Sequence, residues 1–120
     1  MPRLILWVDD NPQHNEVPAA VLKATQANVV QVKSTRQALA QLAARKFDAI
    51  VSDMGRWEGP MEGYALLEQV RQMGLLTPFF FFSAGGGKEK NVALALQRGA
   101  DGSTGSVAEL LEQLHKALYP

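Results

Sequence analysis

Three acidic residues stand directly after two short apolar runs. Asp9 and Asp10 follow residues 4–8, and Asp53 follows residues 49–52. Short apolar runs that stop at acids are typical of central strands in a parallel sheet, whose carboxyl ends open onto the ligand crevice of α/β folds. Three carboxylates gathered there repel one another, and a divalent cation held by oxygen ligands and water is the simplest way to balance them. The alternative for any single acid is a helix cap or a turn residue.

A fourth polar residue, Ser83, follows another apolar run at residues 78–82 and is expected at the same edge. A cation that neutralises an incoming phosphoryl group allows a carboxylate such as Asp53 to act as a nucleophile in spite of the like charges. Ser83 could then donate a hydrogen bond to the product. The run that contains Phe79–Phe82 is most simply core, since a central strand is covered on both faces.

The elements that must position these residues alternate along the chain. Apolar runs predict strands at 4–8, 29–32, 49–52, 78–82 and, more weakly, 101–104. Helical spacing predicts helices at 16–25, from an N-cap at Ser34 to a point before Phe47, and at 63–73, 88–98 and 107–119. Parallel strands joined by helical crossovers predict an α/β protein with a doubly wound five-stranded sheet and helices on both faces.

Composition narrows the range of functions. The 120 residues suit a single domain, 1–120. Twelve basic and twelve acidic residues give a net charge of zero, so no broad electrostatic field indicates nucleic acid or a membrane surface as a partner. The absence of cysteine excludes disulfides, thiolate metal sites and cysteine catalysis. The apolar run before Asp9 is too short for a signal peptide core or a membrane span. We therefore expect a cytoplasmic protein.

Four motifs, each in its expected place, resemble the receiver domains of two-component response regulators. They are Val8-Asp9-Asp10-Asn11, Ser52-Asp53-Met54, Ser83-Ala84 and Gly99-Ala100-Asp101. The resemblance covers the whole chain and implies a flavodoxin-like (βα)5 fold with strand order 2-1-3-4-5. It also implies that the domain takes a phosphoryl group from a histidine kinase or phosphotransfer protein and signals to a downstream protein by conformational change. Such a domain is a signalling module, whose only chemistry is metal-assisted self-phosphorylation.

The resemblance also assigns roles to individual residues. Asp53 would be the phosphoacceptor and a ligand of Mg²⁺, Asp10 a direct ligand with Asp9 alongside, and the Gly55 carbonyl the remaining protein ligand. Ser83 would contact a phosphoryl oxygen.

Three residues that receiver domains usually carry are missing from residues 102–107. Receiver domains usually carry a lysine, followed by proline, at the end of the fifth strand, and this stretch contains neither. The loss removes a fixed positive charge from a site with three acids. Ser103 stands where an aromatic switch residue would be usual, so coupling to the output surface is expected to differ.

Two loops offer candidate substitutes for the lost charge. The loop after Asp53 is about two residues longer than usual, which surface loops absorb readily, and it carries Arg56 and Trp57. The glycine-rich loop at 85–87 is followed by Lys88 and Lys90, and its glycines suggest mobility after Ser83. We hypothesise that Arg56, Lys88 or Lys90 supplies the missing charge. Solvated loop charges are an equally good interpretation of each one.

Two further functions compete with the leading one. A degenerate receiver that acts only as a phosphorylation-independent interaction module is left open by the missing lysine. A phosphatase or phosphotransferase acting on small molecules would require a general acid or a substrate pocket, and the sequence contains no sign of either. The apolar stripe of the last helix is predicted to pack in the core. Any part of it that is exposed could form the contact of a homodimer.

Overall fold

The computed structural model describes residues 2–120, in which five parallel strands form one sheet. The strands are β1 (Arg3–Val8), β2 (Ala27–Val32), β3 (Ala49–Ser52), β4 (Phe79–Phe82) and β5 (Gly102–Thr104). Their order in the sheet is β2-β1-β3-β4-β5. This is the predicted doubly wound topology, and the prediction of strand order 2-1-3-4-5 is confirmed.

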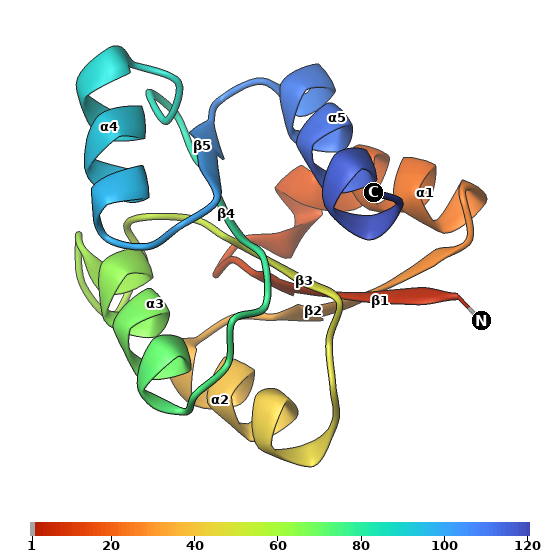
Figure 1. Cartoon of the computed structure of the whole chain (residues 1–120), viewed down its shortest axis with the longest axis horizontal. Coiled ribbons are helices and arrows are strands. Elements are labelled where there is room, and N and C mark those ends of the chain that lie inside the picture. Colours follow the sequence, from red (N-terminus) through yellow and green to blue (C-terminus); the bar gives the residue numbers. More distant parts are fainter. Residues whose placement is uncertain (1) are drawn as a thin grey trace.

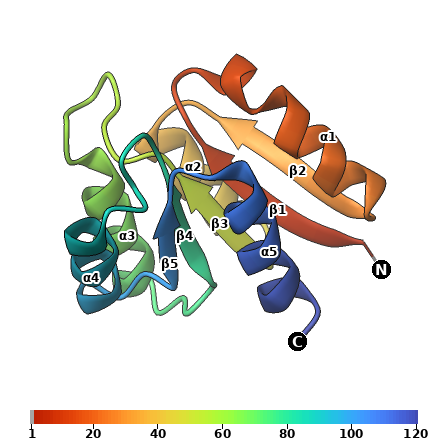
Figure 2. The ribbon, with the colours of Figure 1, turned by 90° about the horizontal axis from the view of Figure 1, so that it is seen from above.

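Helices cover both faces of the sheet (Figure 1). A short 3-10 helix, η1 (Pro12–Asn15), leads into α1 (Glu16–Ala24), and the remaining helices are α2 (Thr35–Ala44), α3 (Glu62–Gln72), α4 (Glu89–Gln97) and α5 (Val107–Leu118). The pair α1 and α5 lies on one face, and α2, α3 and α4 lie on the other, as the view from above also shows (Figure 2). Residues 2–120 contain no helix with the length and apolar character that crossing a membrane requires.

Each central strand is apolar on both sides because both of its faces are covered. In β1, Leu6 and Val8 pack toward α2 and α3, whereas Ile5 and Trp7 pack toward α1 and α5. The phenylalanine run of β4 divides in the same way, with Phe79 and Phe81 on the first face and Phe80 on the second. The interpretation of this run as core is confirmed.

A helix cap, the strand register and a hydrogen bond between distant residues explain where several elements begin. Ser34 caps α2 as predicted, because its hydroxyl accepts the N–H of Gln37 at 3.1 Å. β2 begins at residue 27, two residues earlier than predicted, because Ala27 pairs in register with Arg3. The Asp101 carboxylate accepts the N–H of Phe79 at 2.9 Å, which ties the start of β4 to the residue before β5.

The register of the sheet brings the predicted site residues to one edge. Val8 pairs with Ser52, and Ser52 pairs with Phe81. The residues that follow these strands therefore meet at the carboxyl edge, where Asp9 and Asp53 come from neighbouring strands.

Candidate metal centre

The three acids predicted to share a site do come together. Asp9, Asp10 and Asp53 each present one carboxylate oxygen, and these oxygens all lie within 4.8 Å of one another. Asp9 and Asp10 come from the end of β1, and Asp53 comes from the end of β3 beside it. The juxtaposition follows directly from the parallel register of two adjacent strands.

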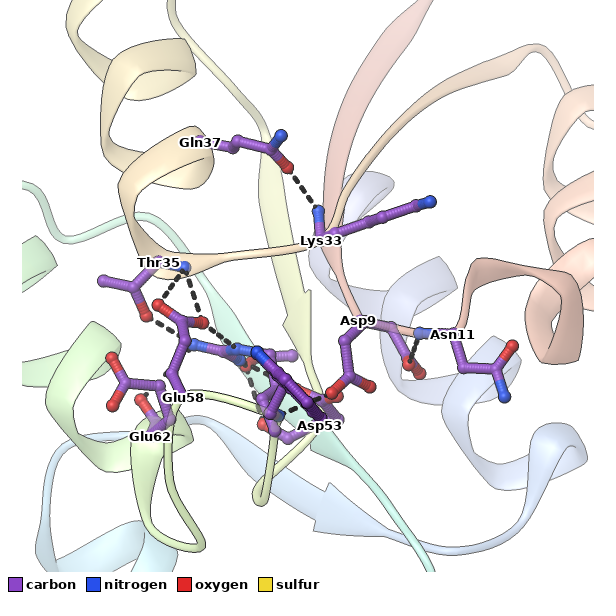
Figure 3. A network of polar contacts seen from close by, with 12 residues as sticks. Asp9, Asn11, Lys33, Thr35, Gln37, Asp53, Glu58 and Glu62 are labelled. Atoms are coloured by element: carbon purple, nitrogen blue, oxygen red, sulfur yellow. Dashed lines mark hydrogen bonds and ion pairs between the residues drawn. The ribbon is translucent and has the colours of Figure 1, made fainter.

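Asp9 and Asp10 are held by different hydrogen bonds. The two oxygens of Asp9 accept the N–H of Asn11 at 2.8 Å and the side-chain amide of the buried Asn15 at 3.0 Å. Asp10 is exposed, and its Oδ2 atom accepts the N–H of Trp57 at 2.6 Å. The network around Asp9 and Asn11 fixes the acid beside Asp53 (Figure 3). Both carboxylates keep lone pairs for another partner.

Asp53 is the buried member of the cluster, with 7% of its surface exposed. Its burial raises the pKa of the carboxyl from 3.8 to about 7, because the charged form loses solvation. Arg56 opposes this rise through a hydrogen bond and its positive charge, whereas the charges of Asp9 and Asp10 add to it. Asp53 therefore titrates close to neutral pH.

Arg56 supplies a positive charge in direct contact with Asp53. Its Nη1 atom lies 2.7 Å from Oδ1 of Asp53 and also donates to the Ser52 hydroxyl at 3.1 Å, and the Arg56 side chain has no exposed surface. Lys88 and Lys90 are exposed, and neither forms an ion pair within residues 2–120. Of the three residues considered as charge substitutes, the structure brings Arg56 to the site and leaves both lysines in solvent.

The longer loop positions Arg56 by folding into a tight turn. The backbone N–H and C=O groups of Arg56 and Gly59 exchange two hydrogen bonds of 2.9 Å, with Trp57 and Glu58 between them. We call residues 56–59 the hairpin. Its two-residue tip leaves the Trp57 side chain 94% exposed. The arginine at its base points inward, which explains how an exposed loop can carry a buried charge.

The acids face an open cleft of about 530 Å³ whose lining includes Asp9, Asp10, Asp53, Gly55, Ser83 and Gly105. Ser83 thus reaches the cleft as predicted. Gly105 lies where the resemblance led us to look for a lysine, so that part of the wall carries no side chain. A Cβ atom at this position would lie 3.0 Å from the Ser83 carbonyl oxygen.

The glycine-rich loop packs closely against the end of β5. A Cβ atom at Gly86 would lie 2.6 Å from the carbonyl oxygen of Thr104, so no other residue fits without a backbone shift. The Ser103 hydroxyl donates to the Gly86 carbonyl at 2.8 Å, and Ser103 is 3% exposed. Close packing is therefore one reason for glycine here, in addition to the mobility that the sequence suggested.

The donor set suits a hard divalent cation. Mg²⁺ takes oxygen ligands at about 2.0–2.1 Å, so two oxygens on opposite sides of one ion are about 4 Å apart. At most one pair of three ligand oxygens can take opposite positions, and neighbouring oxygens in an octahedral site are about 3 Å apart, so oxygens that lie within 4.8 Å of one another draw closer by up to about 2 Å when the ion binds. The residues present therefore fit a magnesium ion. The Oδ1 atom of Asp53 is already paired with Arg56, which leaves its other oxygen for a ligand.

A wider groove of about 700 Å³ lies at the opposite edge of the sheet, between the connections that lead into β3 and β4. Its lining includes Phe47, Asp48, Leu75 and Leu76. The Asp48 carboxylate accepts the N–H of Leu4 at 2.8 Å, so this acid supports the fold. The chemistry of the acidic cluster makes the smaller cleft the better candidate.

Sequence reasoning missed four residues that support the site. They are the buried partners of Asp9 and Arg56 and the acid that pairs with Arg56, namely Asn15, Thr35, Ser52 and Glu58. The place of Thr35 near the site could have been predicted, because Thr35 follows β2 and the predicted strand order places β2 beside β1. The contacts of Ser52 and Glu58 with Arg56 depend on the path of the hairpin, which no periodicity of the sequence predicts.

Comparisons with known proteins agree with this geometry. The family model of the response regulator receiver domain matches residues 5–104. The transcriptional regulatory protein ZraR of Escherichia coli O157:H7 is 34% identical over 96 residues, which cover 80% of this chain. The match is 21% of the length of ZraR, so the chain spans about one fifth of the curated relatives that it matches.

Solved structures show the same fold at lower identity. The receiver domain of the Francisella response regulator 1452 has a TM-score of 0.83 at 20% identity, covering 97% of this chain and 96% of the other. The chemotaxis response regulator CheY4 of Vibrio cholerae has a TM-score of 0.76 at 23% identity, covering 98% and 100%.

Proposed function

Because this chain belongs to the family of response regulator receiver domains, we propose that it accepts a phosphoryl group on Asp53 and signals by a change of conformation. The observation that carries the proposal is a buried carboxylate, Asp53, that lies beside the carboxylates of Asp9 and Asp10 and pairs with the guanidinium of Arg56. The domain is a signalling module of two-component systems and not an enzyme that acts on small molecules.

We propose Mg²⁺ as the cofactor, with Asp9, Asp10, Asp53 and the carbonyl of Gly55 as its protein ligands. The carboxylate oxygens gathered at the carboxyl edge support this assignment, and Gly55 lines the same cleft. When bound, the ion would neutralise charge on the incoming phosphoryl group. Asp9 is restrained beforehand, because both of its oxygens already accept hydrogen bonds from the chain.

In the proposed reaction one carboxylate oxygen of Asp53 attacks phosphorus. The new O–P bond forms as the bond from phosphorus to the donor's leaving group breaks, and the leaving group takes the electron pair. Arg56 holds the Oδ1 atom of Asp53 at 2.7 Å, which keeps the carboxylate oriented and favours its ionised form. Ser83 lines the cleft and is proposed to donate a hydrogen bond to a phosphoryl oxygen.

The proposed partners are a histidine kinase or phosphotransfer protein upstream and a protein target downstream. Receiver domains interact with both kinds of partner, and the curated relatives are named as transcriptional regulatory proteins. The net charge of zero supports contacts with proteins over direct contact with nucleic acid.

Mass spectrometry after incubation with Mg²⁺ and a small-molecule phosphodonor tests this function. The wild-type chain should gain the mass of one phosphoryl group, and Asp53→Asn should gain none. If the wild type gains no mass and does not bind beryllofluoride in the presence of Mg²⁺, the chain is a phosphorylation-independent interaction module instead.

A further inference from the structure

Every N–H group of the Arg56 guanidinium is already used within the chain. A guanidinium carries five N–H donors, and five acceptors surround this one: Asp53 Oδ1 at 2.7 Å, Ser52 Oγ at 3.1 Å, Glu58 Oε1 at 3.1 Å, Thr35 Oγ1, and the Glu62 carbonyl oxygen at 3.5 Å. Arg56 therefore cannot contact a phosphoryl oxygen unless it releases one of these partners.

Glu58 connects the hairpin to the first turn of α2. Its carboxylate oxygens accept the backbone N–H of Thr35 at 3.2 and 3.3 Å, and one of them also accepts Nε of Arg56 at 3.1 Å. Thr35 is the first residue of α2, where backbone N–H groups lack partners within the helix and a negative charge is stabilising. Figure 3 shows Asp53, Glu58 and Thr35 joined in one polar network.

The two ion pairs of Arg56 are not equally strong. The contact with Asp53 is shorter, at 2.7 Å against 3.1 Å for Glu58. The Asp53 side chain is 10% exposed, whereas that of Glu58 is 30% exposed and can be solvated when it is released. Since water compensates an exposed carboxylate better than a buried one, the Glu58 contact is the easier one to break.

On the opposite side of the site, residues 102–105 carry no charged side chain. On β5, Ser103 is small and buried, and its hydroxyl donates a hydrogen bond to the Gly86 carbonyl. Gly105, which follows β5, has no side chain. Arg56 links Asp53 to the first turn of α2 in two ways, directly through the Thr35 hydroxyl and through Glu58, whose carboxylate accepts the Thr35 N–H.

We propose that Arg56 is the positioning residue of Asp53 and that its pairing with Glu58 carries the phosphorylation signal to α2. This inference rests on the proposed phosphorylation of Asp53. Transfer of the phosphoryl group converts the Asp53 carboxylate into a neutral acyl group and places the negative charge on the phosphoryl oxygens. Arg56 turns toward that charge, because its Nη1 donor has lost its ionised acceptor on Asp53 and a charge-assisted hydrogen bond to a phosphoryl oxygen replaces it. It then releases Glu58, and the hairpin loosens from the first turn of α2.

The backbone amide of Thr35 reports on this change, because it is the group that Glu58 caps. Beryllofluoride with Mg²⁺ serves as the phosphoryl mimic, and its bound fluorine signal in ¹⁹F NMR shows binding independently of any change in the protein. In the wild type, the Thr35 amide signal should shift when beryllofluoride is added to the Mg²⁺-containing sample.

Glu58→Ala should bind beryllofluoride, as the fluorine signal shows, but lose most of the Thr35 response. Glu68→Ala is the matched control, because Glu68 is an exposed acid of α3 remote from this network, and it should respond like the wild type. A bound fluorine signal without a Thr35 shift in the wild type, or an undiminished shift in Glu58→Ala, overturns the inference and leaves the phosphoacceptor function standing. No bound fluorine signal in the wild type overturns both.

Discussion

The guanidinium of Arg56 lies 2.7 Å from the carboxylate of Asp53, and the arginine that makes this contact is fully buried. The two residues are separated by only two others, so the loop that follows β3 provides both the acid and its counter-charge. A buried charge without a partner is unstable, and each residue of this pair makes the burial of the other possible. We propose that the positive charge that receiver domains usually take from the end of the fifth strand comes here from Arg56, in the loop that follows β3.

Removal of Arg56 should destabilise the domain strongly. Arg56→Met leaves Asp53 buried beside two other acids without its counter-charge, and breaking such a pair typically lowers the free energy of unfolding by about 3–5 kcal/mol. Urea denaturation at pH 8 measures the loss. Arg36→Met is the control, because Arg36 is exposed on α2 and its replacement should change stability by about 0.5 kcal/mol or less. Equal stabilities for the two variants would contradict the structural role of the pair.

The contribution of Asp53 to the stability of the metal-free domain should fall as the pH rises from about 4 to 7. The pKa of Asp53 is about 7 in the folded chain, above its ordinary 3.8, so the folded state holds the proton more tightly across this window. The contribution of this group is complete below pH 3.8 and is lost as the pH approaches 7, with a slope of up to about 1.4 kcal/mol per pH unit.

Asp53→Asn tests this pH dependence, because asparagine resembles the protonated acid at every pH. Urea denaturation in the presence of a chelator should show that the variant gains stability over the wild type as the pH rises from 5 to 8. Glu89→Gln, which changes an exposed acid at the start of α4, should follow the wild type. Parallel curves for Asp53→Asn and the wild type would mean that Asp53 does not titrate near neutral pH.

Much of the fold and the acidic edge could be read from the sequence, because both depend on local patterns. The runs that became β1, β3 and β4 are apolar on both faces, and parallel pairing then places Asp9, Asp53 and the residue after β4 at one edge. The N-cap at Ser34 was predicted for the same reason, since a cap is formed by residues close in sequence. Strand ends such as Ala27 depend on cross-strand pairing and were less well predicted.

The partners of Arg56 could not be predicted, because they depend on the course of a loop. Arg56, Lys88 and Lys90 look alike as isolated basic residues beside glycine-rich segments. What separates them is the pair of hydrogen bonds between Arg56 and Gly59 that turns the arginine inward. Thr35 and Glu58 are more than twenty residues apart in the chain, and their contact at 3.2 Å follows from the fold alone.

Two neighbouring glycines in the loop after Ser83 should respond very differently to alanine. A Cβ atom at Gly86 meets the backbone of Thr104 at 2.6 Å, whereas one at Gly87 meets nothing closer than 3.7 Å. Gly86→Ala should therefore lower the free energy of unfolding by about 1–3 kcal/mol, as overpacking usually does, and Gly87→Ala should lower it far less. Thermal unfolding of the two variants measures the difference. Similar melting temperatures would show that the loop does not pack against β5 as described.

Binding of Mg²⁺ should change the fluorescence of Trp57. The backbone N–H of Trp57 donates to Asp10 at 2.6 Å, so a cation at Asp10 disturbs the hairpin that carries the exposed indole. The second tryptophan, Trp7, is buried, and Trp7→Phe removes its emission. In that background, Mg²⁺ titration should give a saturable change that Asp10→Asn abolishes. A change that persists in Asp10→Asn would place the cation elsewhere.

The rate at which Asp53 gains a phosphoryl group tests the central claim most directly. Mass spectrometry would follow the reaction with a small-molecule phosphodonor and Mg²⁺ for the wild type, Arg56→Met, Arg56→Lys and Arg36→Met, each first shown to be folded by circular dichroism. We predict that Arg36→Met reacts at the wild-type rate, that Arg56→Met reacts about 100-fold more slowly, and that Arg56→Lys lies between them. A folded Arg56→Met that reacts as fast as the wild type would contradict the claim that Arg56 supplies the charge on which phosphorylation of Asp53 depends.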